Sequence, residues 1–202
     1  MKIQAIAIER EYGSGGTEIG RRLADRIGYG FYGREILEAV SRKYEVPVEK
    51  LERYEETTTG SFLYSIFMLS KVQSGDADFL TGEGHIFAAE QAVIEQLAAS
   101  GPAVFMGHCA CEALKEKPGV LRVFIRCSDE REKRERIIRE YGIPSSEAEA
   151  VRRRFDKKRS NYYYANTTRR WNDAANYDIM LDSGTLGVDG CVAALAGLLQ
   201  NT

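Results

Sequence analysis

The stretch that decides the fold is residues 3–24, which read IQAIAIEREYGSGGTEIGRRLA. An apolar run typical of a buried strand, Ile3 to Ile8, passes into a glycine-rich turn and then into a helical pattern with Ile19 and Leu23 on one side. Glycines in such a turn let backbone N–H groups converge on an anion at a helix N-terminus. We therefore predict an anion site there. Its residues are Gly13, Ser14, Gly15, Gly16 and Thr17.

The loop departs from the usual phosphate-loop pattern G-x-x-x-x-G-K-[ST]. When the second glycine is set on Gly15, the first glycine falls on Arg10, the lysine on Gly16 and the hydroxyl on Thr17. The lysine that ordinarily reaches the β- and γ-phosphates is therefore missing. A strand-to-helix turn that is rich in glycine only for tight packing remains an alternative.

Length and composition favour one compact α/β domain. The chain has 202 residues, 44% of them hydrophobic and 29% charged, which is ordinary for a folded soluble protein. A net charge of −2 argues against a general nucleic-acid-binding protein. Residues Val151–Arg170 nevertheless carry eight Lys/Arg against one acid, Asp156, and a basic island of this kind favours a local anion as partner.

Cysteines and apolar runs bear on the compartment. The four cysteines form no C-x-x-C pair and only two histidines are present, so a structural zinc site is not expected. The first apolar run is too short for a signal peptide, and no run approaches 18 residues. We expect a cytoplasmic protein with reduced thiols and no membrane partner.

Two candidate ligand contacts lie at the ends of predicted strands. Residues 103–106 form a buried-strand pattern that opens onto His108, and ligands in α/β sheets lie outside the carboxyl ends of strands. We favour a ligand-contacting or structural His108 over a general base. Arg34 follows a short strand pattern at 29–33 and precedes a helix from Glu35. It can hold an anion or be a solvated helix-start arginine, and both interpretations stay open.

Further strands are predicted at 121–126 and 177–181, with helices at 86–99, 131–141 and 188–199. The charged helix 131–141 is interpreted as mostly solvated, with a cap at 128–130. The order of strands and helices favours a parallel sheet with helices on both faces. Residues 51–82 are irregular, and their aromatic side chains are interpreted as core in preference to a pocket wall.

A basic helix begins after Pro144. On it Arg152, Asp156 and Arg159 share one face, and two arginines flanking a carboxylate can clamp a phosphate. The alternative is a surface helix whose charges pair with one another. The tyrosines at 162–164 and Trp171 offer stacking faces beyond it.

Together these pieces resemble the cytidylate kinase-like proteins, a divergent branch of the P-loop nucleoside monophosphate kinases. The resemblance rests on EREYGSGGTEIGRRLA, AVFMGHCA, LRVFIRCSDEREKR, RRRFDKKRSNYY and NYDIMLDSGTLGVDG. It implies an α/β fold of the three-layer P-loop NTPase type, with a parallel sheet, helices on both faces and a mobile helical lid. In one domain, 1–202, the acceptor-side helical region would be at about 35–82 and the basic lid at about 143–172.

The resemblance also implies ATP and Mg²⁺ as cofactors and a monophosphate acceptor. Gly13–Thr17 matches the phosphate loop, Thr17 is a possible magnesium ligand, and Mg²⁺ would be held mainly by the nucleotide. Arg152, Asp156 and Arg159 match the lid, and Arg34 and His108 are the acceptor-side candidates. The motif Asp182, Ser183, Thr185 and Leu186 matches the strand end near the nucleotide base.

Two departures from that family pattern matter. Gly16 replaces the loop lysine, and His108-Cys109 replaces an Arg-Asp pair that meets the acceptor nucleotide. Arg10 or a lid arginine can supply the missing cation. The leading hypothesis is an ATP-dependent phosphotransferase acting on a nucleoside monophosphate or related small acceptor. The second is a catalytically inactive nucleotide- or anion-binding regulatory protein. The sequence leaves the acceptor, the pathway and the oligomeric state open.

Overall fold

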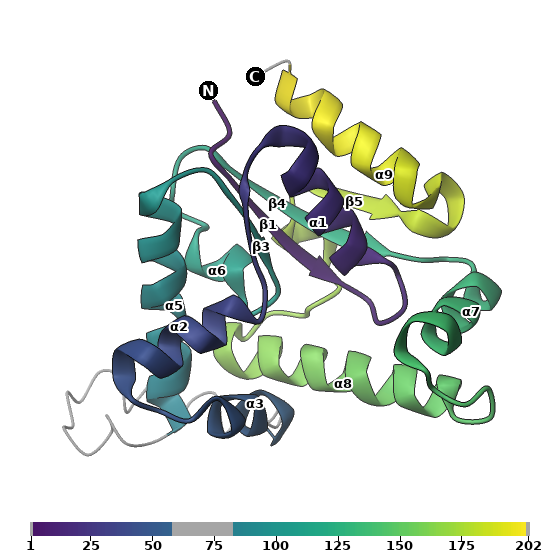
Figure 1. Ribbon diagram of the computed structural model, residues 1–202, viewed down its shortest axis with the longest axis horizontal. Coiled ribbons are helices and arrows are strands. Elements are labelled where there is room, and N and C mark those ends of the chain that lie inside the picture. The colour runs from purple at the N-terminus through teal and green to yellow at the C-terminus, as the bar shows by residue number, and fades with distance from the viewer. Residues whose placement is uncertain (1, 58–82, 201–202) are drawn as a thin grey trace.

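The computed structural model describes residues 2–57 and 83–200 and shows a parallel sheet between two helical layers (Figure 1). The sheet has five strands in the order β2-β3-β1-β4-β5, and every neighbouring pair is parallel. The strands are β1 (Ala5–Arg10), β2 (Gly30–Tyr32), β3 (Ala103–Met106), β4 (Val120–Arg126) and β5 (Ile179–Asp182). This order places β1, which leads into the glycine loop, at the centre.

The helices follow the strands in sequence. They are α1 (Gly16–Ile27), α2 (Glu35–Tyr44), α3 (Val48–Thr57), α5 (Glu83–Ser100), α6 (Ala110–Ala113), α7 (Glu130–Tyr141), α8 (Ala148–Thr167) and α9 (Ser183–Gln200), with a short 3₁₀ turn at Ala174–Asn176. Helix α8 passes close to the carboxyl end of β1. Helix α7 lies beside the amino-terminal half of α8 (Figure 1). The basic helix is thus placed over the loop by the fold itself.

Alternating side chains of β1 build two separate cores. Ile6 and Ile8 pack with α1 and α9 on one face of the sheet. Ala5 and Ala7 belong to the other core, which includes side chains from α2, α3, α5 and α8. Because a strand turns successive side chains to opposite faces, Glu9 is directed to the α8 side and Arg10 to the α1 side.

The predicted fold class is confirmed by this sheet and its flanking helices. The first strand is shifted two residues from the predicted Ile3–Ile8, and the last helix begins at Ser183 with a kink at Gly187 (φ 67°). The prediction of Trp171 as a stacking face was wrong: its ring is 5% exposed and packs edge-on against Phe124 in the core. The aromatic side chains of 51–82, interpreted as core in preference to a pocket wall, fall largely on residues 58–82, outside the described residues.

Candidate functional site

The glycine loop between β1 and α1 has a backbone that needs glycine. Gly13 (φ 77°) and Gly15 (φ 74°) are both left-handed, a conformation that costs other residues about 1–2 kcal/mol. The buried Ser14 side chain holds the turn, because its Oγ donates to Glu11 O at 2.8 Å and accepts from Gly16 N at 3.3 Å. The amides of Gly13 and Gly15 donate to no other group in the described part of the chain. The loop therefore offers ordered N–H groups at the start of α1.

Helix α7 supports this loop from outside. Arg136 Nη1 donates to Gly13 O at 2.7 Å, and a Cβ at Gly13 would lie 2.9 Å from Lys133 and Ile137. The side chains of Lys133 and Arg136 are each 3% exposed, so the prediction of a mostly solvated helix missed its inner face. The physical reason is that the contacts reach across more than 120 residues, which no local pattern encodes.

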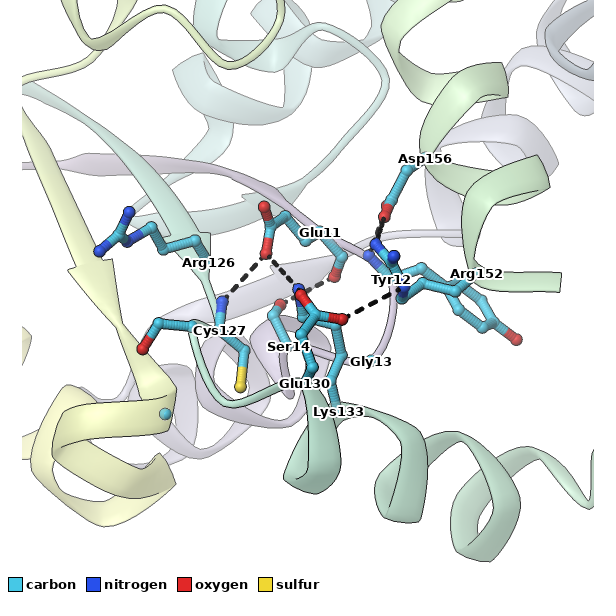
Figure 2. Close-up of polar contacts among 12 residues, drawn as sticks. Glu11, Tyr12, Gly13, Ser14, Arg126, Cys127, Glu130, Lys133, Arg152 and Asp156 are labelled. Atoms are coloured by element: carbon cyan, nitrogen blue, oxygen red, sulfur yellow. Dashed lines mark hydrogen bonds and ion pairs between the residues drawn. The ribbon is translucent and has the colours of Figure 1, made fainter. Parts of the chain in front are cut away.

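The buried ammonium of Lys133 joins three segments (Figure 2). It lies 3.1 Å from Glu11 Oε2 and 3.0 Å from Glu130 Oε1, and Glu11 Oε2 also accepts from Cys127 N at 3.0 Å. Burial lowers the pKa of Lys133, but its two carboxylate partners raise it by more. The loop is therefore fastened to both β4 and α7.

Asp156 fastens α8 to the loop. Its Oδ1 accepts from Tyr12 N at 2.7 Å, as Figure 2 shows, while Arg152 and Arg159 are 3.6 and 4.0 Å from its carboxylate. The Tyr12 ring stacks on Phe155 with centroids 4.6 Å apart. Burial raises the pKa of Asp156, and the Tyr12 N–H opposes that shift. The acid predicted to hold two arginines mainly holds the backbone before Gly13.

The two lid arginines differ in their partners. Arg152 pairs with Glu149 at 2.8 Å and with Glu130 at 3.6 Å, as in the self-paired alternative. Arg159 Nη1 instead donates to Arg10 O at 3.0 Å, and its guanidinium lies 5.5 Å from the centre of the Tyr12 ring. Burial, followed by the positive charge of Arg10, lowers the pKa of Arg159 to about 10, so it stays protonated at neutral pH. Of the two, Arg159 faces the loop.

A cavity of about 400 Å³ lies between the ends of β1 and β3 and helix α8. Arg10, His108 and Arg159 line it, so three predicted site residues meet there. Arg34 is not among the lining residues. Its side chain is 69% exposed and pairs with Glu52 at 3.1 Å, which agrees with the solvated interpretation.

Glu9 is a lining residue that the sequence analysis did not single out. Its side chain is buried, and Oε2 accepts from Trp171 Nε1 at 3.2 Å. Burial raises the pKa of Glu9, while the positive charge of Arg10 lowers it. The available signal was a carboxylate directly after a buried strand run, on the opposite face from Ile8.

The motif at the end of β5 and the start of α9, which includes Asp182 and Ser183, contacts the glycine loop. Asp182 Oδ1 accepts from Ser128 N at 2.9 Å and from Gly184 N at 3.0 Å, and Ser183 Oγ donates to Ser14 O at 2.6 Å. Although burial opposes it, these backbone hydrogen bonds lower the pKa of Asp182. The motif thus ties the start of α9 to the glycine loop.

The residues present fit a nucleotide phosphate chain. Left-handed glycines, ordered amides and the start of a 12-residue helix meet at one point, and Arg159 of α8 donates to the backbone of Arg10 just before it. Thr17 lies exposed in the first turn of α1, where a hydroxyl can contact a magnesium ion carried by the nucleotide. Among residues 2–57 and 83–200, no cluster of three or more His, Cys, Asp and Glu side chains forms a separate metal site. In the same part of the chain, no helix combines the length and apolarity needed to cross a bilayer.

Comparison with known proteins agrees with this geometry. The family model of the cytidylate kinase-like family matches residues 5–185. A crystal structure of an uncharacterized protein from Eubacterium ventriosum ATCC 27560 is similar with a TM-score of 0.72 and 23% identity, covering 98% of this chain and 99% of that one. Shikimate kinase from Bacteroides thetaiotaomicron is similar with a TM-score of 0.55 and 13% identity, covering 99% of each chain. No curated protein matches the sequence.

Proposed function

Because the chain belongs to the cytidylate kinase-like family and has a kinase-like fold, we propose that it is an ATP-dependent phosphotransferase. The γ-phosphoryl group would pass to a nucleoside monophosphate or a related small acceptor. The observation that carries the proposal is the 400 Å³ cavity at the end of β1, the strand that leads into the glycine loop, which is lined by Arg10 and Arg159. Donor and acceptor would thus meet at two cations.

The roles of the chain's own residues follow from their positions. The amides of Gly13–Thr17 and the start of α1 would bind the donor phosphates, and Arg159 would stabilise the charge on the group in transfer. Magnesium, when bound with ATP, bridges phosphate oxygens and neutralises their charge. The latch from Asp156 to Tyr12 would set the distance between α8 and the loop. His108 would contact the acceptor, since it lines the cavity.

Glu9 favours a second candidate for the acceptor. A phosphate acceptor needs no proton removed at neutral pH, whereas a hydroxyl acceptor gains from a general base. The Glu9 carboxylate lines the cavity, and burial raises its pKa above the ordinary value. A small hydroxyl-bearing acceptor, with Glu9 taking its proton, is therefore the alternative substrate class.

The test is a turnover assay with ATP and Mg²⁺ against common nucleoside monophosphates and a set of small polyols and hydroxy acids. Product formation by wild type supports the proposal, and the active acceptor separates the two substrate classes. Arg159→Ala should lower kcat by about 10²–10³-fold, as removal of one oriented donor does. Arg153→Ala is the matched control, because that arginine is on the same helix and 75% exposed. ATP binding without turnover on any acceptor would instead support the inactive nucleotide-binding protein.

A further inference from the structure

The side chain of Arg10 lies in a slot between two glycines. Arg10 has the same parity in β1 as Ile6 and Ile8, so it is directed toward α1. A Cβ at Gly16 would lie 2.5 Å from Arg10 Cβ and 2.8 Å from Arg10 Cγ. On the far side, a Cβ at Gly107 would collide with Arg10 Nη1. Neither position can carry a side chain while Arg10 keeps this path.

Part of the Arg10 guanidinium is buried without a hydrogen-bond partner in the described part of the chain. The atom concerned is Arg10 Nε. A second guanidinium, that of Arg159, is held next to it by a hydrogen bond to Arg10 O. The two positive charges repel, and that repulsion contributes to the lowered pKa of Arg159. Buried polar groups ordinarily have partners, so an anion is the missing one.

From this geometry we infer that Arg10 supplies the cation of the phosphate loop. Arg10 stands where the usual pattern has its first glycine, and Gly16 stands where it has the lysine, so the cation and the glycine have exchanged positions. In G-x-x-x-x-G-K-[ST] the strand supplies glycine and the helix supplies the cation. In this chain the strand supplies Arg10, whose stem fills the volume where a lysine stem would begin, and the helix supplies Gly16. The inference rests on the proposed function only in taking nucleotide phosphate as the anion.

The exchange predicts a specific pattern of single and double variants. Arg10→Ala should weaken binding of ADP and of tripolyphosphate, measured by titration calorimetry, by about 10–100-fold, as loss of a charge-assisted contact does. The matched control is Arg26→Ala, an exposed arginine at the end of α1, which should change affinity less than about 2-fold. Gly16→Lys alone should lose binding, because its stem meets Arg10. The double variant Arg10→Gly/Gly16→Lys restores the usual pattern and should regain at least about 10-fold in affinity over Gly16→Lys.

A second measurement keeps the inference testable if a lysine variant folds poorly. Gly16→Ala should lower the urea midpoint in wild type, where its Cβ meets Arg10 Cβ, and lower it much less in Arg10→Gly. If Gly16→Ala lowers the urea midpoint equally in wild type and in Arg10→Gly, the proposed exchange between Arg10 and Gly16 is wrong. Wild-type affinity for ADP and tripolyphosphate in Arg10→Ala, or no measurable binding by wild type, would overturn the role of Arg10. Binding that depends on Arg10 without turnover on any acceptor would leave this inference standing and remove the proposed function.

Discussion

Removal of the Asp156 carboxylate should release α8 from the glycine loop. A hydrogen bond from a backbone N–H to a carboxylate contributes about 1.5–3 kcal/mol, and that of Tyr12 N to Asp156 Oδ1 is 2.7 Å long. The arginines, at 3.6 and 4.0 Å from the carboxylate, lie beyond hydrogen-bond distance, so we assign the main effect to the Tyr12 contact. We therefore expect Asp156→Ala to lower the free energy of unfolding by about 2–3 kcal/mol, a melting-temperature loss of about 5–10 °C for a chain of this size.

Urea unfolding can be followed through the one tryptophan, Trp171, which is buried next to Glu9. Asp156→Asn keeps an oxygen that can accept from Tyr12 N, so it should cost less than Asp156→Ala. Asp25→Ala, at an exposed position of α1, controls for removal of an acid. Hydrogen exchange at the Tyr12 amide should quicken in the alanine variant. If Asp156→Ala and Asp25→Ala unfold at the same urea concentration, the hydrogen bond from Tyr12 N to Asp156 does not stabilise the fold as we expect.

Three further outcomes are expected. Gly15→Val should abolish phosphate binding in calorimetry while the variant stays folded, because a β-branched residue does not adopt a φ of 74°. Lys133→Ala should lower the free energy of unfolding by about 1–3 kcal/mol, since it leaves the partly buried Glu11 carboxylate without its cation. Arg131→Ala, which is exposed on the same helix, should stay within about 0.5 kcal/mol in urea titrations. The pKa of Glu9 in the folded state lies above its ordinary 4.5, so the folded state binds that proton more tightly than the unfolded state does. The stability of wild type relative to Glu9→Gln should therefore fall as pH rises above 4.5. A difference in unfolding free energy that does not change with pH would contradict this.

Local patterns were sufficient for most of the fold. The apolar runs at β3 and β4 lie within one residue of the predicted strands, because buried parallel strands are continuous and apolar. Asp129 caps α7 as expected, since its side chain accepts from Arg131 N and Glu132 N at 3.0 Å. These features depend on neighbours within a few residues, which is the range over which periodicity and capping operate.

The candidate site was less predictable because its contacts are long-range. The spacing of Arg152, Asp156 and Arg159 correctly placed them on one face, but nothing in the helix says that the acid accepts from Tyr12 N, 144 residues away. Trp171 was expected to offer a stacking face, since an aromatic residue near a basic helix has no local mark of burial. Its true neighbours, Phe124 and Glu9, come from two different strands.

The end of β1 gives the physical basis for the proposal that Arg10 replaces the missing lysine. Successive strand residues point to opposite faces, so Glu9 and Arg10 necessarily serve different sides of the sheet. Glu9 faces the core beneath α8, whereas the stem of Arg10 crosses the first turn of α1, and both residues line the cavity. A cation at the last strand position can therefore stand where the usual pattern needs one, provided that the helix leaves the space. Gly16 leaves that space free, because it has no side chain to meet Arg10. A pattern search that requires lysine at position 16 therefore rejects the loop because of the very glycine that makes room for Arg10.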